Sequence, residues 1–78
     1  MKADLMTEKI IELIGEIRPY EHINPTTELI KSGILDSLAI IGLVVSLEDE
    51  FGVEIADEAV TRENFSTVAA ISSLINKV

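Results

Sequence analysis

A serine follows an aspartate at the start of an apolar stretch, in the segment Gly33-Ile34-Leu35-Asp36-Ser37-Leu38. A serine in this position is most simply a helix N-cap, because its side-chain oxygen accepts a backbone N–H of the first turn. A serine hydroxyl is also a nucleophile that forms covalent bonds to transferred groups. The segment therefore leaves two alternatives for Ser37, a structural cap or a site of chemistry.

The surrounding residues disfavour hydrolysis by Ser37 itself. A hydrolytic serine needs a base, usually histidine, and an oxyanion hole. His22 is the only histidine and is interpreted as an ordinary loop residue, and the G-x-S-x-G elbow is absent. No metal-ligand cluster or glycine-rich phosphate loop is visible either. We therefore expect that the protein is not an enzyme and that it has neither a catalytic residue nor a metal site. Any chemistry at Ser37 is then carried out by another protein.

The bulk charge of the chain narrows its partners. It has 14 acidic and 6 basic residues in 78, a formal charge of −8. Such a charge repels phosphates, so nucleic acid is not an expected partner. It suits proteins with basic docking patches, although solubility alone explains it equally well.

Length and composition predict one small cytoplasmic domain. A chain of 78 residues accommodates a single domain, so residues 1–78 are expected to form one unit. Cysteine is absent, which is compatible with a reducing compartment. Glu8 and Glu12 interrupt the apolar positions near the N-terminus, so we expect neither a signal peptide nor membrane insertion.

The hydrophobic pattern predicts an all-α fold, a small bundle of three longer helices plus one short helix. The first helix is expected over residues 4–18, with Asp4 as its cap and Pro19 as its stop. Its apolar positions recur at helical spacing: Leu5, Ile10, Leu13, Ile14 and Ile17. A long ordered loop from Pro19 to Asp36 follows. Its apolar residues are expected to be buried: Leu29, Ile30, Ile34 and Leu35.

The remaining elements follow from caps and stops. The second helix is expected over residues 37–50, capped by Asp36 or Ser37 and ended by Phe51 and Gly52. A short extended link over residues 53–55 precedes one helical turn over residues 57–61. Ser66 is expected to cap a last helix that ends near Asn76. Its inward residues are Val68, Ile71, Leu74 and Ile75.

The segment from Gly33 to Leu38 resembles the phosphopantetheine attachment motif of acyl carrier proteins, with Ser37 at the modified serine. The similarity continues through residues 43–55, which resemble the rest of that family's second helix and its exit. Residues 65–68 with Ile71 resemble the start of its last helix. Leu29 and Ile30 stand where the family anchors its long loop. The first helix matches only in length and pattern.

The resemblance implies a carrier function and an acyl-carrier-like fold. A phosphopantetheinyl transferase would move a 4′-phosphopantetheine arm from coenzyme A onto Ser37, with Asp36 and Leu38 completing the attachment motif. Asp36 would partly oppose the charge of the phosphate, so it is interpreted as serving a partner or a metal during modification. The protein, expected to be a monomer, would hold cargo as a thioester. It would present that cargo to an acyl- or aminoacyl-activating ligase, an acyltransferase or a synthase.

The second helix carries two apolar stripes. One stripe is expected to face the core: Ile40, Leu43, Val44, Leu47 and Phe51. The other is interpreted as a partner-docking face: Leu38, Ile41 and Val45, continuing to Glu48 and Asp49. The alternative is that the bundle wraps this helix on most sides.

The residues after the motif differ from those of the usual fatty-acid carriers, which have acidic residues there. Here residues 39–42 are Ala, Ile, Ile and Gly. The main expectation is a carrier of acyl intermediates in fatty-acid, polyketide or related biosynthesis. The alternative is a D-alanyl or other aminoacyl carrier, favoured by the form of residues 63–65. A non-covalent acidic helical adaptor, which would not need Ser37, is a third hypothesis.

Overall fold

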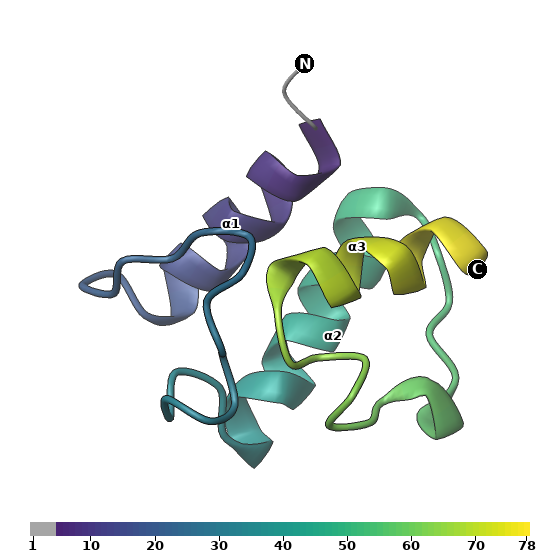
Figure 1. The fold of residues 1–78 in the computed structure, drawn as a ribbon. Helices are drawn as coiled ribbons and strands as arrows, with labels where there is room; N and C mark the ends of the chain where they lie inside the picture. Colours follow the sequence, from purple (N-terminus) through teal and green to yellow (C-terminus); the bar gives the residue numbers. More distant parts are fainter. Residues whose placement is uncertain (1–4) are drawn as a thin grey trace.

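The computed structural model describes residues 5–78 and is all-helical over that range (Figure 1). Its α-helices are α1 (Leu5–Ile17), α2 (Ser37–Phe51) and α3 (Val68–Lys77). Helix α1 packs against both α2 and α3. The predicted all-α class is therefore confirmed for the described residues, and Asp4, the expected first cap, lies outside them.

The short helix expected over residues 57–61 is smaller than predicted. The structure has a single 3₁₀ turn, η1 (Asp57–Ala59), in which Val60 N–H donates to the Asp57 carbonyl at 3.1 Å. Its N-cap position is Ala56, which offers no side-chain acceptor. The backbone leaves helical geometry at Val60 (φ −84°, ψ 79°), so the turn ends there.

Caps and stops set the helix boundaries. Helix α1 ends at Ile17, one residue before the Arg18–Pro19 pair. Helix α2 ends at Phe51 and is capped by Gly52, which has a left-handed φ of 64° and whose N–H donates to the Glu48 carbonyl.

The expected cap of the last helix is wrong by one residue. Thr67, not Ser66, is the N-cap of α3, and its Oγ1 accepts the Ala70 N–H at 3.0 Å. The Ser66 hydroxyl instead donates to the Glu63 carbonyl at 3.0 Å, and the Ser66 carbonyl accepts the Leu29 N–H. Ser66 therefore belongs to the connection before α3, where both of its polar groups already have partners.

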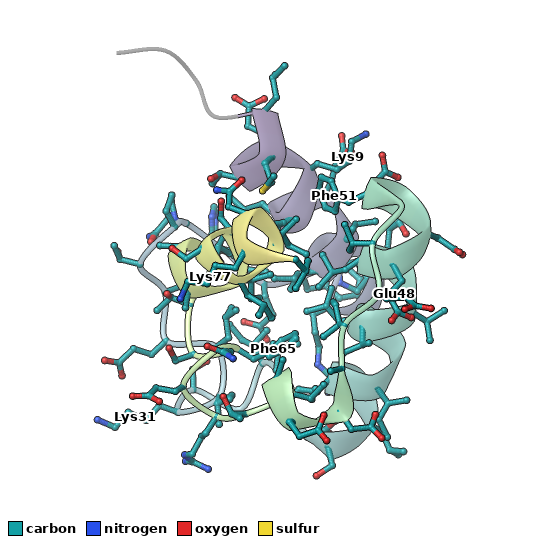
Figure 2. The ribbon with its side chains drawn as sticks, turned by 90° about the vertical axis from the view of Figure 1, so that its right-hand side faces the viewer. Lys9, Lys31, Glu48, Phe51, Phe65 and Lys77 are labelled. Atoms are coloured by element: carbon teal, nitrogen blue, oxygen red, sulfur yellow. The ribbon has the colours of Figure 1, made fainter. Side chains whose placement is uncertain are left out.

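One apolar core, aliphatic apart from Phe65, joins the three helices to the two long connections, and Phe65 is its largest fully buried side chain (Figure 2). Leu29, Ile34 and Leu35 of the first connection are buried, as expected, whereas Ile30 is half-buried. Of the apolar positions at helical spacing in the first helix, Leu5 is 77% exposed at the start of α1, whereas Ile10, Leu13 and Ile14 are buried.

The core face of α2 is narrower than the sequence indicates. Leu43 and Leu47 are fully buried and Ala39 is 8% exposed, but the rest of the expected stripe is only half-buried: Ile40, Val44 and Phe51. α2 therefore makes its deepest contacts through a line of residues spaced by four.

Lys9 links α1 to the far end of α2 (Figure 2). Its Nζ lies 3.3 Å from Glu12 Oε1 and 3.7 Å from Glu50 Oε2. The hydrogen bond and charge of Glu12, with the charge of Glu50, raise the pKa of Lys9 above its usual value. Because these groups are exposed, water screens the attraction and the pairs contribute little to stability.

Candidate functional site

Ser37 is the first residue of α2, and its side chain is exposed. The helix start is fixed by Asp36, which has extended backbone angles (φ −106°, ψ −175°) and accepts the Ala39 N–H on Oδ1 at 2.9 Å. Of the two predicted caps, the structure therefore selects Asp36. Ser37 does not serve as the cap, so its hydroxyl is free of that structural role.

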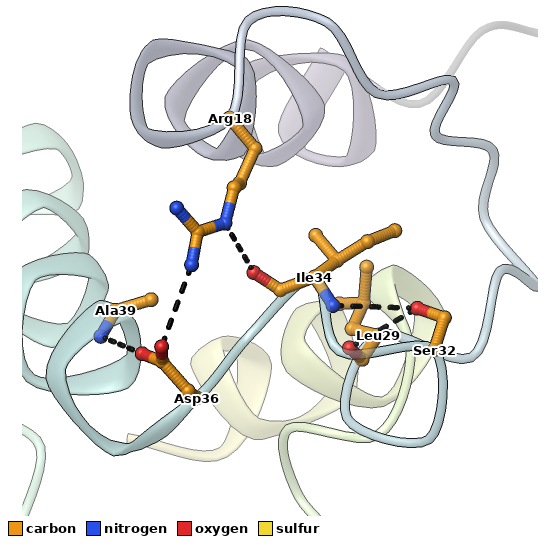
Figure 3. Close-up of polar contacts among 6 residues, drawn as sticks. All are labelled: Arg18, Leu29, Ser32, Ile34, Asp36 and Ala39. Carbon is orange, nitrogen blue, oxygen red and sulfur yellow. Dashed lines mark hydrogen bonds and ion pairs between the residues drawn. The ribbon is translucent and has the colours of Figure 1, made fainter.

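A turn before Asp36 is held by its own hydrogen bonds (Figure 3). Leu35 N–H donates to the Leu29 carbonyl at 2.9 Å, and the Ser32 hydroxyl donates to the same carbonyl at 3.3 Å. Gly33 has φ 85°, a left-handed conformation that side chains rarely adopt, and it reverses the chain at this point. The segment therefore reaches Ser37 along a defined path.

Arg18 connects the end of α1 to this turn (Figure 3). Its Nε donates to the Ile34 carbonyl at 3.0 Å, and its Nη2 lies 3.5 Å from Asp36 Oδ2. Both oxygens of Asp36 thus have partners inside the chain. Sequence reasoning missed Arg18, and the only signal was a cation at the end of the first helix.

The predicted docking side chains lie along one exposed side of α2. The exposed fractions are 80% for Leu38, 62% for Ile41 and 55% for Val45. Asp49 is also exposed, but Glu48 is half-buried and its Oε2 accepts the Ile55 N–H at 2.9 Å (Figure 2). Glu48 is therefore an internal link between α2 and the segment that follows it.

A groove of about 480 Å³ opens beside Ser37. One side is formed by the start of α2 and the turn before it, and the other by the connection between η1 and α3. We call it the Ser37 groove; its lining residues are Ile30, Gly33, Leu35, Asp36, Ser37, Ile40, Val60, Thr61 and Arg62.

Other site types are not seen in the described part of the chain. His22 is exposed, and no hydrogen bond joins it to Ser37 within residues 5–78. Over the same range, no group of three or more His, Cys, Asp or Glu side chains is arranged to hold a metal ion. None of the helices in this range is long and apolar enough to cross a membrane.

Comparison with known proteins identifies the family. The family described as "Phosphopantetheine attachment site" matches residues 7–75. The chain belongs to this family. The curated relatives that match include the D-alanyl carrier protein of Bacillus velezensis, which is 23% identical over 73 residues, or 91% of this chain and 90% of the relative. No solved structure matches.

Two further relatives carry the same name. The D-alanyl carrier proteins of Staphylococcus saprophyticus and Staphylococcus xylosus are 23% and 25% identical, each over 91% of this chain and 94% of the relative. The protein is thus a carrier protein whose cofactor is covalently bound 4′-phosphopantetheine. Carrier proteins are not themselves catalytic, and in general they work with transferases and ligases.

The contacts of Asp36 predict a graded loss of stability. Replacing Asp36 with Ala removes the acceptor for Ala39 N–H and should lower the free energy of unfolding by about 1 kcal/mol. Asp36→Asn keeps a capping oxygen and loses only the attraction to Arg18, so its loss should be smaller. Urea denaturation measures both, and equal losses would mean that the cap contributes little.

Proposed function

We propose that Ser37 is the attachment residue and that the chain, as a single domain over residues 1–78, carries an aminoacyl cargo of the D-alanyl class. The observation that carries the cargo assignment is the match to D-alanyl carrier proteins over 91% of the chain. These relatives favour the aminoacyl alternative over the fatty-acid and polyketide pathways expected as the main function. The adaptor hypothesis loses ground because it gives no reason for membership of a phosphopantetheine family.

Several features support Ser37 as the residue that holds the arm. Its hydroxyl is exposed at the first position of α2, and the N–H groups of Ser37 and Leu38 have no hydrogen-bond partner within residues 5–78. Free N–H groups and the positive end of the helix dipole favour a phosphate attached there. The Arg18 guanidinium offsets the nearby Asp36 carboxylate, which would otherwise repel that phosphate. The residues present therefore fit the group.

The residues of the chain have a presenting role in this proposal. When bound, the arm supplies a terminal thiol that holds the cargo as a thioester. The chain has no cysteine, so the working sulfur comes with the cofactor. Asp36 and Arg18 keep the attachment point at a fixed place on the bundle, from which a phosphopantetheinyl transferase and a ligase reach it.

The charge of an aminoacyl cargo favours its staying in water. A D-alanyl thioester carries an ammonium group, and burying an unpaired charge is costly. Among residues 5–78 the buried core is apolar apart from Ser72, so that core offers no carboxylate for such a group. We therefore expect the aminoacyl end to remain outside the core.

Intact mass spectrometry tests the attachment residue. Incubation with coenzyme A and a broad-specificity phosphopantetheinyl transferase should add one phosphopantetheine unit to the protein, and Ser37→Ala should abolish the gain. Ser73→Ala, which removes another exposed serine, is the matched control and should be modified normally. Modification of the Ser37→Ala variant would reject the assignment. If an active transferase did not modify the unsubstituted protein, the adaptor hypothesis would become the leading one.

The cargo class is tested by loading the modified protein. With D-alanine, ATP and a D-alanine-activating ligase, we expect a mass gain of one alanyl group that hydroxylamine removes, as for a thioester. A parallel reaction with an acyltransferase and acyl-coenzyme A donors is expected to give little product. The reverse preference would overturn the aminoacyl proposal while leaving the carrier function intact.

Leu38, Ile41 and Val45, with Asp49, are proposed as the docking face for these partners. Glu48 is placed only at the edge of this docking face, because its carboxylate already accepts the Ile55 N–H. Ile41→Ser should lower the loading efficiency of the ligase (kcat/KM) roughly tenfold, the loss typical of a central apolar contact. Leu5→Ser, which replaces another exposed large apolar residue, on α1, is the control and should load normally.

Salt separates apolar docking from charge-driven docking. Because the proposed contact is mainly apolar, rising salt should weaken the ligase reaction only slightly over the range in which charge attraction is screened. A steep loss with salt, or normal loading of the Ile41 variant, would contradict this docking face.

A further inference from the structure

Arg62 lies on the wall of the Ser37 groove that is opposite the start of α2. It comes from the connection between η1 and α3, whereas Ser37 comes from the start of α2, and both line the same hollow. Arg62 also lines two further hollows, one shared with Lys31 and Ser66 and one shared with Glu63 and Ser66. Arg62 therefore lies where the Ser37 groove and the two further hollows meet.

The guanidinium of Arg62 has no partner among residues 5–78. Lys9, Arg18 and Lys31 each lie within 4 Å of a carboxylate, whereas Arg62 makes neither an ion pair nor a hydrogen bond within that range. Its lack of a partner is unexpected in a chain with 14 acidic residues. An unpaired guanidinium offers a planar fork of donors that matches phosphate oxygens.

The other charges in the groove leave Arg62 as the cation available to an anion. Asp36 also lines the groove, but its two oxygens are engaged by Ala39 N–H and by Arg18. The remaining walls are largely apolar, through Ile30, Leu35, Ile40 and Val60. A ligand with one negative group near Ser37 and an apolar segment next to it would match this arrangement.

We propose that Arg62 binds the phosphodiester that joins the arm to Ser37 and holds the first part of the arm along the Ser37 groove. This inference rests on the proposed attachment at Ser37. The phosphodiester carries one negative charge, and the next segment of phosphopantetheine is a carbon with two methyl groups. Ile40 and Val60 provide the apolar surface for that segment.

The same contact would hold the phosphate end of the arm and repel a positively charged cargo. The positive charge of Arg62 repels an ammonium group, so an aminoacyl end is not held in this groove. The arm's phosphate end is retained and its thioester end is left accessible to partner enzymes. Arg62 is thus a positioning residue for the arm, with no part in any bond-forming step.

The experiment compares NMR spectra of the unmodified and modified full-length protein. On modification, we expect the Arg62 Nε–H resonance and the Ile40 and Val60 methyl resonances to shift, with contacts from the arm's geminal methyl groups to Val60. In the Arg62→Gln variant the methyl shifts should fall by half or more. Lys77→Gln is the matched control, because Lys77 is a second unpaired cation within residues 5–78 but lies at the opposite end of α3 (Figure 2).

Two additional measurements distinguish charge from shape. Salt near 1 M, where the screening length falls to about 3 Å, should reduce the Arg62 shift more than the methyl shifts. Arg62→Lys keeps the charge but loses the fork, so it should retain part of the effect. Arg62 is exposed and unpaired, so these variants are expected to keep the spectrum of the unmodified fold.

The outcomes separate this inference from the attachment proposal. No mass gain on incubation with the transferase would refute attachment at Ser37, and with it the basis for the Arg62 contact. A mass gain with shifts confined to Asp36, Ser37 and Leu38, equal in the original protein and in both Arg62 variants, would overturn the Arg62 contact alone. Shifts that depend on Arg62 but not on Lys77 would support it.

Discussion

The burial of Leu29 is the constraint on which the rest of the structure depends. Its side chain is fully buried, its N–H donates to the Ser66 carbonyl at 2.8 Å, and its carbonyl accepts the Leu35 N–H at 2.9 Å. One residue thereby joins the core, the entry to α3 and the turn that leads to Ser37. Without this anchor, the connection between α1 and α2 would lose the contacts that offset its conformational entropy. Through these two hydrogen bonds, Leu29 links the turn before α2, on one side of the Ser37 groove, to the connection before α3, on the other.

At the start of α2, the ion pair between Arg18 and Asp36 offsets a charge repulsion that the attachment motif would otherwise cause. The N-cap aspartate starts the helix, but its charge opposes any phosphate on the next residue. Arg18, from the end of α1, meets the carboxylate at 3.5 Å and also holds the Ile34 carbonyl. The charge of the cap is thus balanced by a residue 18 positions away, which ties the geometry of Ser37 to the packing of α1.

Some features of the fold follow from local sequence signals, whereas others depend on tertiary contacts. Helix positions, the Gly52 stop and most buried residues of the loop follow from periodicity and local chemistry. The cap of α3 does not, because Ser66 and Thr67 are both favoured cap residues, whereas in the structure Ser66 bonds to Leu29 and Glu63 and Thr67 is the cap. Arg18 and Arg62 were missed for a related reason: Arg18 contacts residues far along the sequence, and Arg62 lines the same groove as Ser37, and no local pattern indicates either placement. The exposed stripe of α2 was visible because it interrupts the periodicity of the core face.

The internal hydrogen bond of Glu48 limits how much charge the exposed side of α2 can offer to a partner. Its backbone carbonyl accepts the Gly52 N–H at the end of α2, and its carboxylate accepts the Ile55 N–H beyond that end. Its side chain therefore fixes the turn out of α2 and is only partly available to a partner. Along this side of the helix, Asp49 is then the exposed acid nearest the apolar residues. A carrier with this surface would be selected by shape and apolar contact more than by charge, although the chain as a whole carries a formal charge of −8. In the proposed docking, the net charge would govern approach and solubility, while the exposed side of α2 would decide which enzyme fits.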